Sequence, residues 1–299
     1  MNSRLLALIA AFSASFIYGI NHTIAKGLMP KVIEPFGFIL LRVTGAAILF
    51  WIISLFYQRE KIDRKDWGRF IICALFGMVI NMNFFFKGLE LSTPINSSVV
   101  ITLSPVLLLI LSALILSEKI TLIRGVGIAL GLGGALLLIL FGAKIQTNAP
   151  NIPLGNFFFF VNAASYAFYL IFVKKLVGKY SSITLMKFMF LIAFLINLPI
   201  GWSQLSAVEW TGLNFSELWQ LGFVVVCTTV LTYLFNIYAL KQLSPSVIGV
   251  FIYLQPLIAA IFAVATGADS LSPLRIGAAF LIFFGVYLTT RKKKIPASA

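Results

Sequence analysis

The sequence predicts an all-α, polytopic membrane protein whose ten transmembrane helices form two inverted five-helix repeats. Of its 299 residues, 60% are hydrophobic and 11% are charged, which leaves too little polar surface to cover a soluble domain of this size. Apolar stretches of about 18 or more residues recur along the chain, and each can cross roughly 30 Å of hydrocarbon as a helix. Matching residues also recur at a spacing of 151.

Windows of about 20 residues locate the helices. The first unit is expected at 5–141, with helices near 5–25, 36–57, 67–90, 96–117 and 122–141. The second is expected at 154–290, with helices near 154–174, 182–203, 218–240, 246–267 and 273–290, followed by a basic cytoplasmic tail at 291–299. The start of the chain imitates a signal peptide, but its apolar run continues to Ala25 and therefore predicts a first transmembrane helix.

Basic residues set the orientation, because Lys and Arg accumulate on the cytoplasmic side. With both termini inside, sixteen of the 23 basic residues fall at inner loops and ends, and five at the outer side: Lys26, Lys31, Lys87, Lys144 and Arg275. The basic residues stand in short loops between apolar spans and not on a soluble face with interleaved aromatics. The expected partners are therefore the lipid bilayer and a small-molecule substrate, with no nucleic acid.

An internal repeat underlies the division into two units. At an offset of 151 Pro105 aligns with Pro256 and Gly134 with Gly285, and at an offset of 148 Tyr18 aligns with Tyr166. Five crossings are an odd number, so the second unit enters the membrane from the opposite side. Inverted repeats are a recurring plan of secondary transporters, in which they alternate access to a site near the midplane.

Several motifs stand in a fixed order: YGINHTIAK at 18–26, FFFKGLELSTP at 84–94, SEKIT at 117–121 and GVGIALGLGG at 125–134. Together they resemble the EamA family of the drug/metabolite transporter superfamily, over nearly the whole chain in two copies. The resemblance implies a ten-helix carrier of the bacterial inner membrane, often an exporter of amino acids, other metabolites or toxic compounds. His22 departs from the family, which more often has an aromatic or apolar residue after the Asn.

Two prolines inside apolar spans are candidate hinges. Pro105 and Pro256 each remove a backbone hydrogen bond and kink a helix, and the carbonyl that Pro105 frees is that of Ile101. Freed carbonyls at membrane depth persist only where protein or a watery cavity satisfies them. The alternative is that these bends only shape packing. Polar neighbours of the two prolines are candidate cavity residues: Ser98, Thr102, Tyr253 and Gln255.

Two basic residues, Arg42 and Lys187, lie well inside predicted spans and away from their ends. An ionisable side chain near the bilayer centre costs about 2.5 to 3.5 kcal/mol, so both are expected to face the protein interior. There they could neutralise a carboxylate substrate. The alternatives are a bond to helix-end carbonyls or a side chain that extends to the surface.

A polar stripe on the first helix is expected to face the interior. Ser15, Tyr18, His22 and Lys26 recur at spacings of three, four and four. His22 is the only histidine, a residue type that titrates near physiological pH, and it is a candidate for proton coupling or for simple packing. Glu90 is the other proton candidate, although a surface ion pair with Lys87 also fits. Further candidate cavity residues are Asn83, Asn162, Tyr166, Tyr169, Tyr233 and Asn236.

The sequence has no HExxH motif, no phosphate-binding glycine loop after a strand and no cluster of Cys and His, so neither an enzyme nor a bound metal or cofactor is expected. The predicted function is secondary transport, most simply export, of small organic metabolites such as amino acids. Alternatives remain open: an anion-selective carrier, suggested by Lys26, Arg42, Lys87 and Lys187; a drug or cation exporter; or a membrane scaffold or sensor that transports nothing. A monomer is compatible with the sequence.

Overall fold

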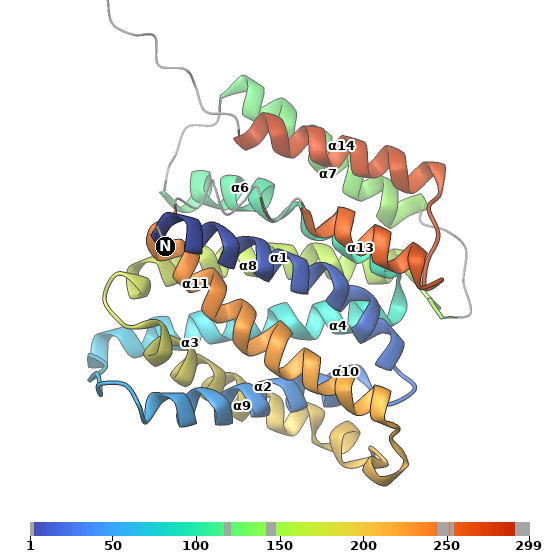
Figure 1. Cartoon of the computed structure of the whole chain (residues 1–299). Helices are drawn as coiled ribbons and strands as arrows, with labels where there is room; N and C mark the ends of the chain where they lie inside the picture. The colour runs from blue at the N-terminus through green and yellow to red at the C-terminus, as the bar shows by residue number, and fades with distance from the viewer. Residues whose placement is uncertain (1–2, 117–120, 142–147, 244–250, 252–253, 291–299) are drawn as a thin grey trace, which may run out of the picture.

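The computed structural model describes residues 3–116, 121–141, 148–243, 251 and 254–290. Within these residues the chain is helical and contains no β-strand (Figure 1). Seven helices are long and apolar enough to cross a membrane, and three further apolar helices, at 125–134, 254–265 and 276–285, are shorter. The predicted span at 246–267 lies partly outside the described residues, as does the whole of the predicted tail.

The first half comprises five helical segments. They are α1 (Ser3–Leu28); α2 (Pro35–Ser54); a third span formed by η1 (Arg64–Asp66), α3 (Trp67–Ala74), η2 (Leu75–Ile80) and α4 (Asn81–Leu91); a fourth formed by α5 (Pro94–Ile101) and α6 (Ser104–Leu116); and α7 (Leu122–Phe141). Proline at the first position starts α2 and α5 without losing a hydrogen bond.

The second half repeats this order as far as it is described. It comprises α8 (Ile152–Val177); α9 (Ser182–Ser206); η3 (Trp210–Gly212); a span formed by α10 (Phe215–Val225), η4 (Val226–Leu231) and α11 (Thr232–Gln242); α13 (Leu254–Ala265); and α14 (Pro273–Thr290). Polar caps fix three of the starts, and Ser181 caps that of α9. Asn151 accepts a hydrogen bond from the amide of Leu154, and Asn214 and Glu217 form a reciprocal capping box.

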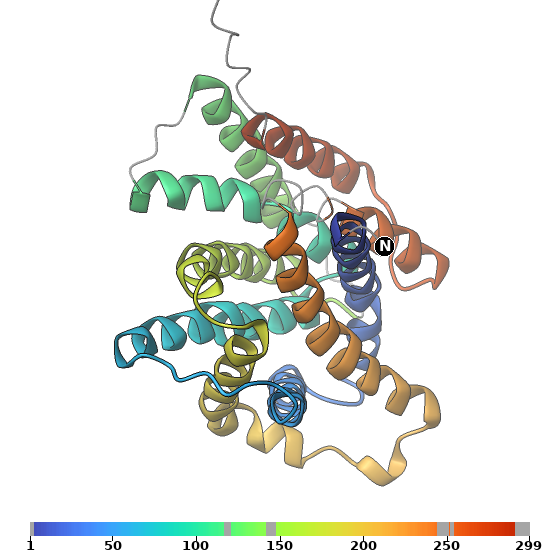
Figure 2. The ribbon, with the colours of Figure 1, turned by 60° about the vertical axis from the view of Figure 1, so that its left-hand side comes forward.

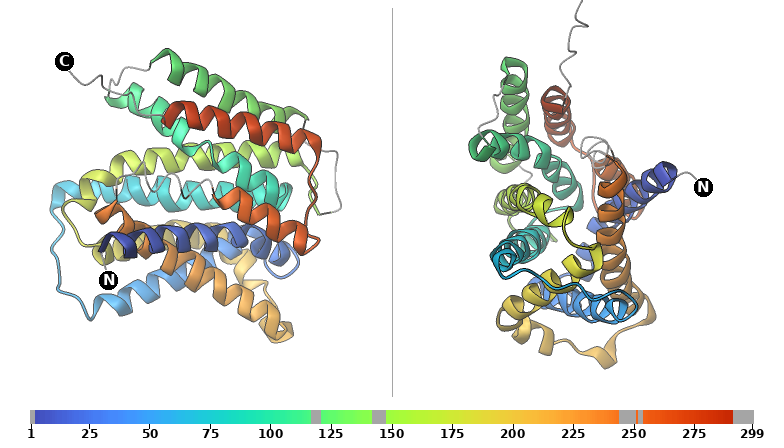
Figure 3. Two further views of the ribbon diagram at one scale, coloured as in Figure 1. Left: turned by 45° about the horizontal axis from the view of Figure 1, so that its top comes forward. Right: turned by 90° about the vertical axis from the view of Figure 1, so that its left-hand side faces the viewer.

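The helices pack in pairs that bring the two halves together. The most extensive contacts join α2 with α9, α7 with α14, α4 with α8, and α1 with both α11 and α13. Figure 2 and both panels of Figure 3 show α7 and α14 side by side at one edge of the molecule, away from α2 and α9. All five pairings join a helix of the first half to a helix of the second half.

Two wide π-helical turns interrupt otherwise regular spans. The segments η2 and η4 each contain six residues, and they begin at Leu75 and Val226, 151 residues apart. This spacing equals the offset of the sequence repeat. Such turns inside α-helices are frequent at functional sites.

The carbonyls around η2 are satisfied by side chains of the second half. Ser165 donates from its Oγ to the carbonyl of Phe76 at 2.6 Å, and Tyr233 donates from its hydroxyl to the carbonyl of Gly77 at 3.3 Å. The ring of Tyr169 also packs closely against Gly77, since a Cβ at Gly77 would lie only 2.5 Å from that ring. The second half therefore packs tightly against this π turn.

The fourth span breaks at the predicted hinge. The helix ends at Ile101 and resumes at Ser104, directly before Pro105. The carbonyl of Ile101 accepts a hydrogen bond from the Ser104 hydroxyl at 2.8 Å, so a neighbouring hydroxyl replaces the missing backbone donor. Pro256 lies in the first described turn of α13, and residues 252–253 before it lie outside the described chain.

An ionic cluster joins the loop before α3 to the loop between α8 and α9. Lys179 bonds to both Asp63 and Asp66, and Tyr180 donates to Asp66 at 2.8 Å. These hydrogen bonds, the bond to Asp63 first, raise the pKa of the Lys179 ammonium. The cluster therefore fastens a loop of the first half to a loop of the second half at the polar end of the bundle.

Glycines allow α7 and α14 to approach closely. A Cβ on Gly285 would lie 2.5 Å from the carbonyl oxygen of Gly127 and 2.5 Å from the amide nitrogen of Gly131, and a Cβ on Gly134 would lie 2.8 Å from the carbonyl oxygen of Ala278. These partners are backbone atoms, which cannot rotate away. The pairing depends on the absence of side chains at this seam.

We therefore expect Gly285→Ala to separate α7 from α14 and to lower stability by about 1 to 3 kcal/mol, the usual cost of overpacking. The matched control is Gly277→Ala in the same helix, where an added Cβ would meet nothing within 4 Å. Thermal unfolding in detergent should show a lower melting temperature for the first variant and an unchanged or slightly higher one for the second. Equal behaviour of the two would contradict the close seam.

Candidate functional site

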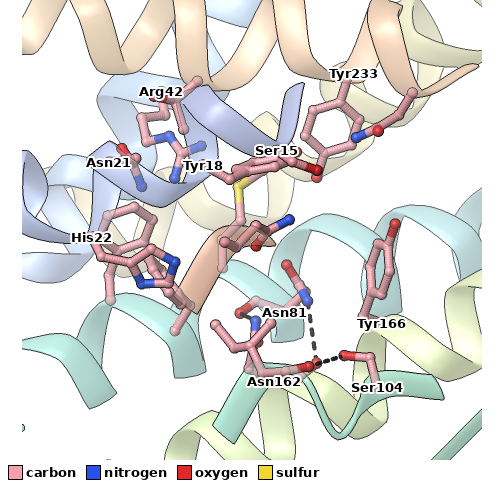
Figure 4. A pocket seen from close by; sticks show the side chains of 17 residues that line it. Ser15, Tyr18, Asn21, His22, Arg42, Asn81, Ser104, Asn162, Tyr166 and Tyr233 are labelled. Atoms are coloured by element: carbon pink, nitrogen blue, oxygen red, sulfur yellow. Dashed lines mark hydrogen bonds between the residues drawn. The ribbon is translucent and has the colours of Figure 1, made fainter. Parts of the chain in front are cut away.

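A cavity lies between the two halves and encloses about 930 Å³ of empty space, open solvent at its mouth included (Figure 4). Its walls come from α1, α2, the third and fourth spans, α8, the segment formed by η4 and α11, and α13. Eight of the predicted cavity residues line it: Tyr18, His22, Arg42, Asn162, Tyr166, Tyr233, Asn236 and Gln255. The other lining residues are Ser15, Asn21, Asn81, Met82, Phe85, Phe86, Ile101, Ser104 and Thr228.

Arg42 is the only basic side chain among the described lining residues. It is 4% exposed, its Nε donates to the Thr229 hydroxyl at 2.9 Å, and its guanidinium carbon lies 4.7 Å from the centre of the Phe86 ring. Among the described residues no carboxylate forms an ion pair with it. Figure 4 shows the guanidinium reaching into the cavity beside Tyr18 and Asn21. The site therefore contains a buried positive charge that the described chain does not neutralise.

Thr229 holds this cation in place. Its hydroxyl accepts from Arg42 and donates its own hydrogen to the carbonyl of Val224 at 2.8 Å. Thr229 is fully buried within η4. The π turn, a hydroxyl and the guanidinium thus form one continuous chain of hydrogen bonds. With Nε occupied, the terminal nitrogens of Arg42 remain as donors towards the cavity.

Two oxygen atoms in the cavity wall are buried without a hydrogen-bond partner, the Asn21 Oδ1 and the Thr228 Oγ1. Buried polar atoms are nearly always hydrogen-bonded, so these two oxygens are unsatisfied acceptors beside the cavity, and a solute or water reaches them only if the wall opens. By contrast, Asn81 and Asn162 each donate to the other's backbone carbonyl, at 3.2 and 2.7 Å. That reciprocal pair fixes the third span against α8.

His22 shares a hydrogen bond with Ser97. Its Nδ1 lies 2.6 Å from the Ser97 Oγ, and the Ser97 Oγ also lies 2.8 Å from the carbonyl oxygen of Pro94. When the Ser97 hydroxyl donates to Pro94, the hydrogen between His22 and Ser97 belongs to Nδ1. The Nε2 of the neutral ring is then an acceptor. The ring packs edge-on against Phe85, 5.4 Å between centres.

Four of the other predicted cavity residues do not line this cavity and have partners in the helix packing. Ser98 and Thr102 donate to backbone carbonyls of their own helix. Asn83 donates to the Asn197 Oδ1 at 2.7 Å. Tyr169 packs against Gly77. Tyr253 lies outside the described residues.

The remaining charged candidates also lie outside this cavity. Lys26 donates to the carbonyls of Leu89 and Glu90 at 2.7 and 2.8 Å, where it closes the end of α4. The Glu90 carboxylate forms an ion pair with Lys87. Lys187 lines a second, separate hollow near the end of α2. These long side chains reach helix ends, where their charge is less costly than at the bilayer centre.

Sequence reasoning missed the residues that complete the site. Asn21 adjoins His22 in a motif already noted, so its neighbourhood was a usable signal. Thr228 and Thr229 carried none, because threonine is common in membrane helices and the π turn that presents them has no marker in its sequence.

Comparison with known proteins agrees with the arrangement of helices. A chain in a solved crystal structure superposes with a TM-score of 0.64 at 18% identity and covers 95% of this chain and 96% of its own. This likeness shows a shared fold.

Sequence relatives extend over almost the whole chain. A protein of Archaeoglobus fulgidus called an uncharacterized transporter is 25% identical over 96% of this chain and 99% of its own. The uncharacterized transporter YyaM of Bacillus subtilis is 23% identical over 84% and 83%, and the WAT1-related protein At3g18200 of Arabidopsis thaliana is 21% identical over 96% and 82%. The model of the EamA-like transporter family matches residues 5–140 and 153–291. This multi-pass membrane chain therefore belongs to the EamA-like transporter family of the drug/metabolite transporter superfamily.

Proposed function

We propose that this transporter exports small organic solutes that carry a carboxylate, such as amino acids, by alternating access. The observation that carries the proposal is Arg42, a buried guanidinium that reaches into the central cavity without an acidic partner in the described chain. Guanidinium and carboxylate match in geometry and form strong charge-assisted hydrogen bonds. A solute carboxylate would neutralise the charge of Arg42.

The charge of the cavity distinguishes this substrate class from organic cations. No Asp or Glu is among the described lining residues, so nothing in this wall would compensate a positively charged solute, and Arg42 would repel it. A zwitterionic amino acid can place its carboxylate at Arg42 and its ammonium against neutral oxygens and aromatic faces. A carrier of purely anionic carboxylates uses the same contact with Arg42.

Alternating access is supported by the correspondence between the halves. The π turns begin 151 residues apart, at the offset that relates the two sequence repeats. The contact of α4 with α8 joins the third span of the first half to the first span of the second half, and the contact of α11 with α1 joins the third span of the second half to the first span of the first, so the two contacts correspond. We propose two inverted five-helix units, each presenting one π turn near the central cavity, which exchange conformations as access alternates.

The orientation that we propose has both termini in the cytoplasm of a bacterial cell, with the chain in its inner membrane. Its support is the excess of Lys and Arg at the inner loops and ends. In this orientation the cluster of Lys179 with Asp63 and Asp66 lies on the cytoplasmic side. Outward transport rests on the family resemblance.

For proton coupling we propose His22 over Glu90. His22 lines the cavity and has one nitrogen not engaged by Ser97, whereas the Glu90 carboxylate is paired with Lys87 outside it. Arg42 is the charged group that shares the cavity with His22. Because both groups face the same cavity, the charge of a proton on His22 and the charge of a solute bound at Arg42 would affect each other's binding.

The central test is binding by the purified protein in detergent. A ligand that binds the folded state raises the melting temperature, and we expect carboxylates, amino acids among them, to do so when nucleosides and cationic drugs do not. Arg42→Gln should weaken carboxylate binding at least about 30-fold, because removing one partner of a buried charge pair costs 2 kcal/mol or more. The matched control, Lys31→Gln, removes one exposed charge outside the cavity. Stabilisation by cationic drugs in wild type and Arg42→Gln alike would contradict the proposal.

Thr229→Val should misplace Arg42 with little change in side-chain volume. We expect about tenfold weaker carboxylate binding, from the loss of a hydrogen bond to a charged group, with recovery in Thr229→Ser. Thr44→Val is the matched control, because Thr44 bonds only to the carbonyl of Leu40 in the same helix as Arg42. Nuclear magnetic resonance of the Arg42 Nε–H gives a readout without substrate, which should show faster solvent exchange in Thr229→Val alone. An unchanged rate of solvent exchange at the Arg42 Nε–H in Thr229→Val would show that Thr229 does not position Arg42.

His22→Gln should uncouple transport from protons. In liposomes that contain the protein, an imposed pH gradient should drive accumulation of the best-binding carboxylate in wild type but not in His22→Gln. Exchange of labelled for unlabelled solute should persist, because it needs no net proton movement. Glu90→Gln should keep gradient-driven accumulation. Gradient-driven accumulation in His22→Gln would exclude this residue as the coupling site.

A further inference from the structure

A second hollow lies where α2 ends and α9 begins, away from the central cavity. It holds about 470 Å³ of empty space, open solvent included, and its walls combine basic, hydroxyl and aromatic side chains. Lys187 and Arg59 supply positive charge, and Ser54, Thr184 and Tyr57 supply hydroxyl groups. The transport mechanism uses none of these residues.

Lys187 keeps its charge available in this hollow. Its ammonium lies 4.2 Å from the centre of the Trp51 ring and 5.0 Å from that of Phe188, contacts that stabilise a cation without neutralising it. Its hydrogen bond to the Ser54 Oγ is long, at 3.4 Å. Among the described residues no carboxylate pairs with Lys187.

One acidic residue also lines the hollow, and it is engaged elsewhere. Both carboxylate oxygens of Glu60 accept from the amide of Ser181, at 3.2 and 2.9 Å. The charged lining is therefore two basic groups against one acidic group that is bound to the start of α9. The net charge of the hollow favours an anion.

The surroundings indicate the kind of anion. Lys187 lies five residues into α9, about 8 Å from its start at 1.5 Å per residue, so it stands near one end of a membrane-spanning helix. Next to it α2 exposes apolar side chains, with Ile48, Ile52 and Leu55 between 49% and 73% exposed. Trp51 and Tyr57 at the rim are also exposed, as is typical of residues at the membrane interface.

We propose that this hollow binds the phosphate of an anionic phospholipid, with Lys187 and Arg59 at the headgroup and the acyl chains along the exposed face of α2. Basic pockets between membrane helices recognise lipid headgroups in this way. The same charges could hold a free phosphate, but the adjoining apolar face of α2 favours a ligand with acyl chains. This proposal is independent of what the central cavity transports.

The test uses the full-length protein, delipidated in detergent and titrated with phosphatidylglycerol, phosphatidylcholine, inorganic phosphate or glycerol 3-phosphate. We expect phosphatidylglycerol to raise the melting temperature by several degrees and to give a discrete bound species in native mass spectrometry. Phosphatidylcholine, which has the same chains and no net charge, should act much more weakly. The two water-soluble phosphates should have little effect.

Variants separate this site from general attraction to a basic surface. Lys187→Gln should abolish most of the shift caused by phosphatidylglycerol, and Lys187→Arg should keep it. Lys61→Gln is the matched control, because it removes one charge from the neighbouring loop without touching the hollow, and the shift should remain. An equal loss in Lys61→Gln, equal shifts with phosphatidylcholine, or full competition by inorganic phosphate would each overturn the proposal. Lys187→Arg also reports whether the position tolerates substitution.

Discussion

A carbonyl group inside a bilayer has no water to bond to, so each departure from the α-helix needs a donor from the protein. This constraint shapes the centre of the molecule. Backbone groups are displaced at three places: the π turns η2 and η4 and the break before Pro105. At each place a side-chain hydroxyl donates to a backbone carbonyl: Ser165 and Tyr233 at η2, Thr229 at η4 and Ser104 at the break. Because the donors at η2 come from the second half, irregular backbone in one half depends on the other half.

The same irregular backbone positions the functional charge. Arg42 is fully within the membrane-spanning part of α2, where a cation is expensive. Its partner Thr229 stands in the η4 turn, where the hydroxyl bonds both the Val224 carbonyl and the Arg42 Nε. The Phe86 ring covers another side of the guanidinium. A conformational change that alters η4 would therefore act directly on the group that we propose binds the substrate.

Sequence patterns predicted the helices better than their interruptions. Apolar length located the described spans, and Pro35, Pro94 and the Asn214 capping box mark helix starts that follow local rules. The fourth span was expected to be continuous with a kink, whereas the structure breaks it at 102–103. The π turns were not expected, because LFGMVI and VCTTVL resemble any apolar helix segment and their geometry depends on tertiary partners.

Among the site residues, those on a periodic polar face were predicted and those defined by long-range contacts were not. Tyr18 and His22 follow from the stripe on α1, and Arg42 follows from its depth. Lys187 has a similar depth in sequence, but its long side chain reaches Trp51 near the end of α2. The two cations are distinguished by aromatic rings that lie far away in sequence. Lys187 contacts Trp51, 136 residues away, and Arg42 contacts Phe86, 44 residues away.

The equal spacing of the two π turns places them at matching positions of the two sequence repeats. They begin 151 residues apart, which is the offset that relates the repeats. The two turns nevertheless differ in chemistry: at the place of Thr229 the first copy has Met78, which has no hydroxyl to offer a cation. The same backbone geometry therefore serves two purposes, and only the second turn bonds Arg42.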